Sequence, residues 1–79
     1  MTLTEMMALH VGDEVYTHFS HAYRRAVVVV IEAKHLHVEG QAVKGGKLRR
    51  RAKYQSVDTA ETGRARLGMA NGPLERRVR

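Results

Sequence analysis

The sequence predicts a mainly-β fold, a small barrel of about five short strands with a short helix near the C-terminus. Three observations support this: short segments of alternating apolar and polar residues, a spacing between them of about 8–12 residues, and glycine-bearing turns that separate them. With 79 residues the chain has room for one domain. We expect that domain to span residues 11–72, between an N-terminal leader (1–10) and a basic C-terminal tail (73–79).

The first predicted elements are a helical turn and a half-buried strand. Residues 2–9 fit one helical turn with Thr2 or Thr4 as its cap, or the lead into a strand. A turn at Gly12 and Asp13 precedes an alternating segment, residues 14–19. One face of this segment carries Val15, Thr17 and Phe19, and the other carries Glu14, Tyr16 and His18.

The strongest strand signal is a run of four valines and an isoleucine within residues 24–33. β-branched side chains favour a pleated sheet over a helix. Because the run does not alternate, we expect either burial on both faces or a strongly curved strand. In both cases it is the central strand of the sheet.

Further along the chain, residues 36–39 predict a third short strand, which ends at Gly40, and residues 44–47 (Lys-Gly-Gly-Lys) predict a hairpin turn. A basic strand over residues 48–57 follows. One side of it carries Leu48, Arg50, Ala52, Tyr54 and Ser56, and the cationic side carries Arg49, Arg51, Lys53, Gln55 and Val57. Asp58 has the spacing of a helix cap, although Gly63 and Gly68 should weaken the helix, and residues 71–73 (Asn-Gly-Pro) predict its end.

Composition excludes several classes of function. The chain has no cysteine, so disulfide frameworks, thiolate zinc sites, Fe–S clusters and thiol catalysis are ruled out. Its longest apolar run, residues 26–31, is far shorter than the roughly 20 residues of a membrane helix. We expect a soluble, untargeted, cytoplasmic protein without a membrane partner.

Charge divides the chain into two halves. Up to Gly40 there are three basic and five acidic residues, whereas from Gln41 onward there are eleven basic and three acidic ones. All five histidines lie in the first half. A basic half of this kind attracts polyanions, with an affinity that falls steeply as salt rises. An acidic protein surface or simple solvation of the face are the other interpretations.

Residues 11–15 (Val-Gly-Asp-Glu-Val), the valine run and residues 36–38 (Leu-His-Val) together resemble the first three strands of an SH3-like barrel of the KOW or Tudor kind. The resemblance covers residues 11–57, without the glycine that the KOW pattern has shortly before the second strand. It implies a module of transcription, translation or the ribosome, or a reader of peptides. In composition the chain is also similar to small phage or mobile-element proteins that inhibit a host machine.

We therefore expect a non-enzymatic protein that contacts the phosphate backbone of RNA or DNA. Ten of its fourteen cations are arginine, which binds phosphate in a bidentate manner and stacks on bases. The expected contacts are Lys44, Lys47, Arg49, Arg50, Arg51, Lys53, Arg64 and Arg66, with Arg76, Arg77 and Arg79 extending the track. Tyr54 alternates with the arginines, so we expect it on the core side.

The alternative function is a protein-interaction module, or a phage-type inhibitor, that docks on an acidic surface of a host protein. The valine-rich strand could serve as an edge for strand addition and form a homodimer. No cofactor is expected. Glycines 45 and 46 suit a turn better than a phosphate loop, and neither Ser20 nor Ser56 lies in a nucleophile elbow.

A metal site is the remaining alternative. Histidines 35 and 37 share one face of a strand, and His18 with His21 could join them across a hairpin. Such a site needs third and fourth ligands. Protonation of the histidines below about pH 6.5 would instead strengthen polyanion binding.

Overall fold

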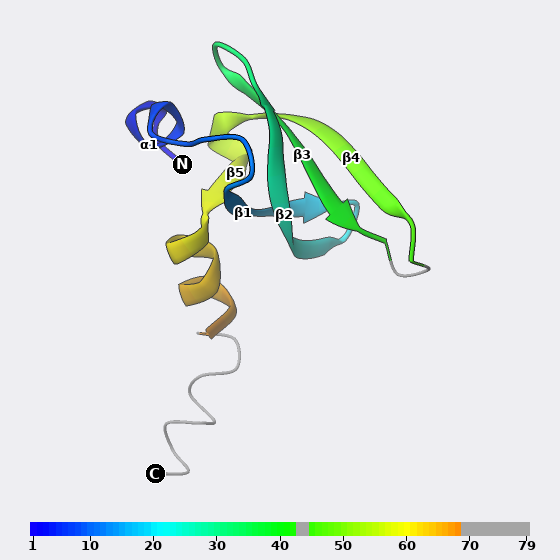
Figure 1. Cartoon of the computed structure of the whole chain (residues 1–79). Coiled ribbons are helices and arrows are strands. Elements are labelled where there is room, and N and C mark those ends of the chain that lie inside the picture. The colour runs from blue at the N-terminus through cyan, green and yellow to red at the C-terminus, as the bar shows by residue number, and fades with distance from the viewer. Residues whose placement is uncertain (43–44, 69–79) are drawn as a thin grey trace, which may run out of the picture.

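The computed structural model describes residues 1–42 and 45–68 and forms one curled antiparallel sheet (Figure 1). The strand order is β4-β3-β2-β1-β5. The elements are α1 (Leu3–Met7), β1 (Glu14–Phe19), β2 (Ala22–Ile31), β3 (His35–Gln41), β4 (Lys47–Lys53), the 3-10 turn η1 (Tyr54–Ser56), β5 (Val57–Thr59) and a helix over residues 60–68. The predicted mainly-β fold with five short strands and a short helix near the C-terminus is confirmed.

The sheet must curl because its two edges are joined by a very short connection. β4 and β5 are opposite edges by strand order, and only η1 lies between them in the chain. A flat five-stranded sheet would hold its edges about 19 Å apart, at about 4.8 Å per strand. A three-residue 3-10 turn advances only about 6 Å. The edges therefore approach each other where η1 joins them, and the sheet curls around the core.

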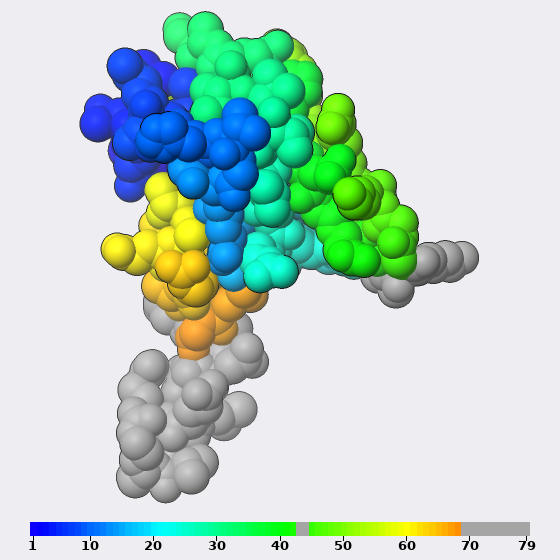
Figure 2. All heavy atoms as spheres, in the orientation of Figure 1, coloured from blue at the N-terminus to red at the C-terminus, as the bar shows by residue number. Residues whose placement is uncertain are grey.

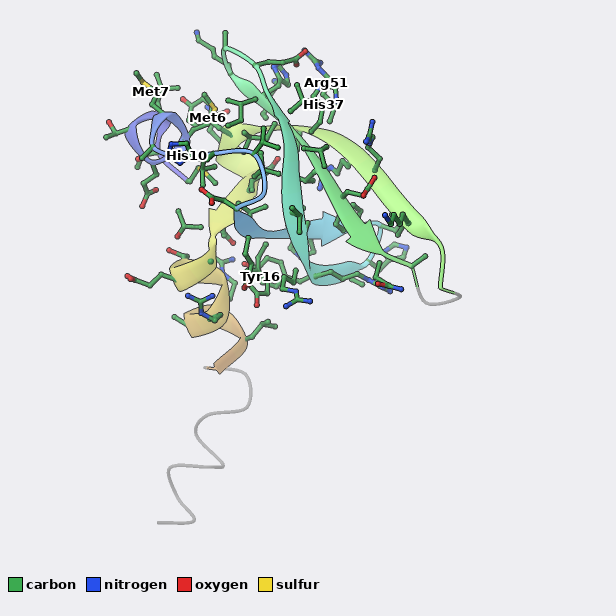
Figure 3. The ribbon with its side chains drawn as sticks, in the orientation of Figure 1. Met6, Met7, His10, Tyr16, His37 and Arg51 are labelled. Atoms are coloured by element: carbon green, nitrogen blue, oxygen red, sulfur yellow. The ribbon has the colours of Figure 1, made fainter. Side chains whose placement is uncertain are left out.

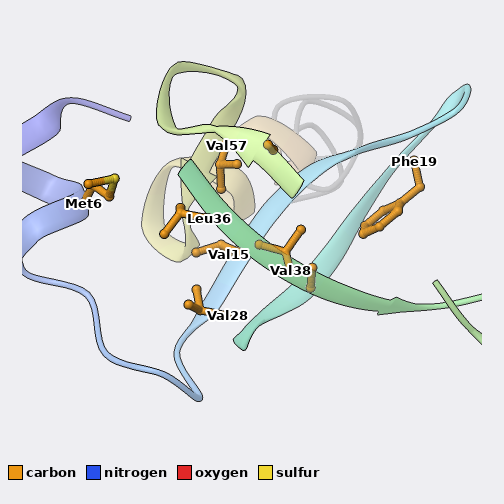
Figure 4. Packing of buried hydrophobic residues seen from close by; sticks show 9 residues of the cluster. Met6, Val15, Phe19, Val28, Leu36, Val38 and Val57 are labelled. Atoms are coloured by element: carbon orange, nitrogen blue, oxygen red, sulfur yellow. The ribbon is translucent and has the colours of Figure 1, made fainter. Parts of the chain in front are cut away.

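The core lies on the concave face of the curled sheet (Figure 4). On β1 the predicted inward set, Val15, Thr17 and Phe19, is buried as expected, but Tyr16 of the predicted outer face is buried as well, against Gly63 of the helix over residues 60–68. Met6 of α1 is buried in the same cluster, so the leader helix contributes to the core. The remaining buried members of this cluster are Ala26, Val28, Leu36, Val38, Ala52 and Val57.

The valine-rich strand β2 is central, as predicted, and it is curved rather than buried on both faces. Ala26 and Val28 are buried, whereas Val27 and Val30 are exposed on the outer face. The register against β3 shifts between Val28 and Val30, which marks a bulge. β2 pairs with β1 on one side and with β3 on the other, so it is an inner strand of the sheet. The expectation that the valine-rich strand serves as an edge for strand addition is therefore wrong. The two edges are β4 and β5.

The predicted basic strand over residues 48–57 is interrupted. β4 ends at Lys53, η1 turns the chain, and β5 begins at Val57. Continuous alternation would place Val57 beside the exposed arginines, but the turn rotates it into the core, where it is fully buried. Tyr54 packs against that core, on the side that the alternation predicts.

Both described helices are capped by threonine. Thr2 caps α1 in a reciprocal capping box with Glu5, which selects one of the two predicted caps. At the second helix Thr59 Oγ1 accepts from the Thr62 N–H at 3.2 Å, so Thr59, and not Asp58, is the cap. Within the described residues, neither helix has the length and apolar character needed to cross a membrane.

Candidate nucleic-acid interface: the outer face of β4

Four cations form one row on the outer face of the edge strand β4, and we call this row the β4 strip: Lys47, Arg49, Arg51 and Lys53. They are alternate residues of one strand, so their side chains leave the same face about 6.7 Å apart. All four are exposed, with side-chain exposures of 78% for Lys47, 61% for Arg49 and 54% for Arg51. In Figure 2 the residues of β4 lie along one border of the molecule.

The neighbouring strand β3 holds two members of the β4 strip with one carboxylate. Glu39 lies opposite Arg49 in the register. Its carboxylate is 3.5 Å from the Arg49 guanidinium and 3.7 Å from Lys47 Nζ. Exposed pairs of this kind contribute only about 0–1 kcal/mol, so phosphate can replace the carboxylate as the partner of both cations.

A second acidic contact lies at the other end of the strip. Arg51 Nε donates to Glu32 Oε1 at 2.8 Å, and His37 Nε2 is 3.4 Å from the same oxygen. Figure 3 shows Arg51 and His37 together at this end of the sheet. The hydrogen bond from Arg51 holds the pKa of Glu32 below its usual value, against a smaller opposing effect of desolvation. With four cations and two carboxylates, the face is positive overall.

Arg50, expected to contact phosphate, is instead engaged inside the curled sheet. Its guanidinium donates to Thr17 Oγ1 at 3.1 Å and to the backbone carbonyl of His18. β5 pairs with β1 only as far as Thr17, so the carbonyl of His18 lies just beyond the last strand pair. Arg50 therefore bridges β4 to β1 where β5 has not yet begun. The alternation had already placed Arg50 on the core side, away from the cationic face.

The other expected phosphate contacts are not part of the β4 strip. Arg64 and Arg66 lie on the helix of residues 60–68, beside the opposite edge of the sheet. Arg64 is 3.1 Å from Glu14, and Arg66 is 3.7 Å from Asp58. Lys44 falls outside the described residues, as do Arg76, Arg77 and Arg79.

The helix is held by an aromatic cluster on the outer face of β1 and β2. The rings of Tyr16 and Tyr23 stack with centroids 5.8 Å apart, and the Arg66 guanidinium lies 5.8 Å from the Tyr23 ring. The Tyr23 hydroxyl donates to Asp58 Oδ2 at 2.6 Å. Desolvation is the largest cause of the raised pKa of Tyr23, and this hydrogen bond is the second. These rings hold the helix on the sheet, and the rings beside the β4 strip are His35 and His37 on β3.

The histidines do not form a metal centre in the described part of the chain. His35 and His37 share the outer face of β3, as predicted, but their cross-strand neighbours are Lys53 and Arg51. His18 packs on Tyr23 instead, at 5.0 Å between centroids. Among residues 1–42 and 45–68, no three side chains gather that could ligate a metal ion.

Sequence reasoning missed Arg25. It lines a shallow depression on the outer face together with Val27, Val29, Glu39 and Lys47. Counting back from Val27 in steps of two places Arg25 on the same face as Val27, so the period of the strand could have identified it. The depression extends the positive surface from the β4 strip across β3 to β2.

Comparisons with known proteins yielded no matching family model, no matching curated protein and no matching solved structure.

Proposed function

We propose that this protein binds RNA or DNA through contacts from the β4 strip to the phosphate backbone. The observation that carries the proposal is the row of four exposed cations at two-residue intervals on one edge strand. Their repeat of about 6.7 Å is commensurate with successive phosphates along an extended strand. We expect side chains in such a row to reach consecutive phosphates of one strand.

The acidic neighbours of the strip support this function. Glu39 and Glu32 hold Arg49 and Arg51 across the outer face in the free protein. An arginine held in this way loses less conformational freedom when phosphate takes the place of the carboxylate. Among the described residues, α1 has five residues and the helix of residues 60–68 packs against Tyr16 of the sheet. Neither is free to enter a groove, so we expect affinity for the backbone with little preference for sequence.

The barrel type is part of the same proposal. A meander of four strands, a single 3-10 turn and a fifth strand paired back to the first support the SH3-like barrel that the sequence resembles. This barrel type and the β4 strip favour a role in transcription or translation, with RNA or DNA as the ligand, in the cytoplasm.

The test is fluorescence-polarisation binding to unrelated single-stranded RNA and double-stranded DNA, from low to physiological salt. Four phosphate contacts give a log–log salt slope of about −3 on a single strand, at about −0.7 per contact. The double variant Arg49→Gln/Arg51→Gln should flatten the slope by about 1.4 on single-stranded RNA and by about 1.8 on double-stranded DNA, whatever the sequence.

The charge-matched control is Arg64→Gln/Arg66→Gln, which removes the same charge from the helix. It should leave the slope nearly unchanged, because these side chains lie away from the strip. An equal loss in both double variants, or no binding at low salt, would contradict the proposal.

A further inference from the structure

Within the described residues β4 is an edge strand, so one side of it carries backbone groups that pair with no other strand. Two hydrogen bonds that flank the β3–β4 ladder show which residue pairs in it are hydrogen-bonded. Ala42 N–H donates to the Gly46 carbonyl at 2.6 Å, and Tyr54 N–H donates to the Lys34 carbonyl at 3.2 Å. An antiparallel ladder alternates between bonded and non-bonded residue pairs. Counting between these two bonds along the register shows which β4 residues face β3.

Even-numbered and odd-numbered residues of β4 direct their backbone groups to opposite sides of the strand. The backbone of Leu48, Arg50 and Ala52 faces β3, while that of Arg49 and Arg51 faces the open side. The two outward residues belong to the β4 strip. At this edge the chain therefore offers N–H and C=O groups in the plane of the sheet, and cationic side chains on the face above them.

This pattern fits a polypeptide strand better than phosphate. Each outward residue presents a donor and an acceptor together, and a phosphate can satisfy only the donor. An added strand satisfies both through the ladder that already joins β3 to β4. On the concave face, the partly exposed Leu48 lies on the same strand and offers an apolar contact to that partner.

We propose that an extended acidic segment of a partner protein adds to the β4 edge as a further strand. Its outward side chains are Asp or Glu, which meet the β4 strip, and its inward side chains are apolar, which cover Leu48. Alternation of acidic and apolar residues is thus the recognition signal. Strand addition is a second binding activity beside the proposed nucleic-acid function. Because both ligands use the side chains of the β4 strip, they exclude one another.

A second copy of this chain is a poorer occupant of the same edge. Pairing β4 with β4 of another copy would oppose two rows of four cations, and like charges across strands are destabilising. The other edge, β5, has only three residues before the helix begins at residue 60. Neither edge of a second copy matches the charge and length of β4.

The first experiment uses the unaltered chain and measures amide hydrogen exchange at Arg49 and Arg51. Two synthetic peptides of the same composition are compared: one alternates Glu with Val, and the other separates Glu and Val into blocks. The alternating peptide should slow exchange at both amides at least tenfold, and the block peptide should not. Unchanged exchange with the alternating peptide would overturn the proposal.

Two variants at one position separate the edge from the charge. Arg49→Gln and Arg49→Pro both remove one cation, but only proline removes the outward N–H, at an edge position where sheets tolerate proline. Arg49→Pro should weaken binding of the alternating peptide at least tenfold beyond Arg49→Gln, while the two variants bind nucleic acid equally. Equal peptide binding by both would refute strand addition, whatever the result for nucleic acid.

Should Arg49→Pro fail to fold, the exchange experiment on the unaltered chain decides the question alone. Sedimentation of the chain without peptide completes the test. A dimer that protects the amides of Arg49 and Arg51 would assign the edge to a second copy and overturn the acidic partner.

Discussion

The ring of Tyr16 lies against the backbone of Gly63, so near that a Cβ on residue 63 would stand 2.2 Å from Tyr16 Cδ1. The same hypothetical atom would be 2.3 Å from Cγ and 2.6 Å from Cβ of Tyr16, so the base of the side chain, which cannot swing away, occupies the space. Tyr16 is buried in spite of its outward position on β1. A glycine that should weaken the helix is thus what allows the helix to dock.

Substitution Gly63→Ala should lower the free energy of unfolding by about 1–3 kcal/mol, because overpacking outweighs the gain in helix propensity. Chemical denaturation followed by circular dichroism measures the change. Gly68→Ala is the matched control, since a Cβ there meets nothing within 4 Å. The control should be neutral or stabilising by up to about 1 kcal/mol, and destabilisation of similar size in both variants would contradict this account.

Arg50→Met should also destabilise the fold, by about 1–3 kcal/mol, because it removes charged hydrogen bonds to Thr17 and to the His18 carbonyl while keeping an apolar stem. Urea denaturation is the measurement. Arg49→Met removes an exposed cation from the preceding position and should lower the free energy of unfolding by no more than about 1 kcal/mol. Nucleic-acid affinity should show the reverse order, with the greater loss in Arg49→Met, and the same order in both assays would disprove the division of roles.

The Glu32 carboxyl should titrate below its ordinary value of 4.5, mainly because Arg51 donates a hydrogen bond to it. Since the pKa is lower in the folded state, the stabilisation is present above the unfolded pKa and is lost as pH falls through the folded one. NMR titration of the side-chain carboxyl follows this directly. Arg51→Gln should raise the midpoint toward 4.5 and His37→Gln should raise it less, and a midpoint that ignores Arg51→Gln would show that the pair is not formed in solution.

Periodicity predicted the parts of this fold in which one strand face is buried. The alternation from Val15 to Phe19 fixed that face correctly, and the β-branched run identified the central strand. Periodicity gave the wrong result over residues 48–57, where one continuous strand was predicted. The residues of η1 have the composition of a strand, and the turn is needed only because β4 and β5 lie at opposite edges of the curled sheet. Thr59 rather than Asp58 became the cap for a similar reason, since pairing of β5 with β1 continues through Asp58 to Thr59.

The candidate site was predictable as a face and not as a set of partners. Alternation along β4 separated Arg49, Arg51 and Lys53 from Arg50, as the structure has them. The pairs with Glu32 and Glu39 could not be derived, because they depend on the register of β3 against β4. Predicting that β4 is an edge strand would have required the complete strand order.

The pairing of β5 with β1 has a consequence for the order of folding. The ladders from β1 to β4 join neighbouring segments, whereas Val15 pairs with Thr59 across most of the domain. Closing so long a loop costs more chain entropy than closing any of the hairpins, so this ladder should form last. During synthesis the meander can assemble early, but one side of β1 stays uncovered until residues 57–59 have left the ribosome, and an exposed strand edge invites aggregation.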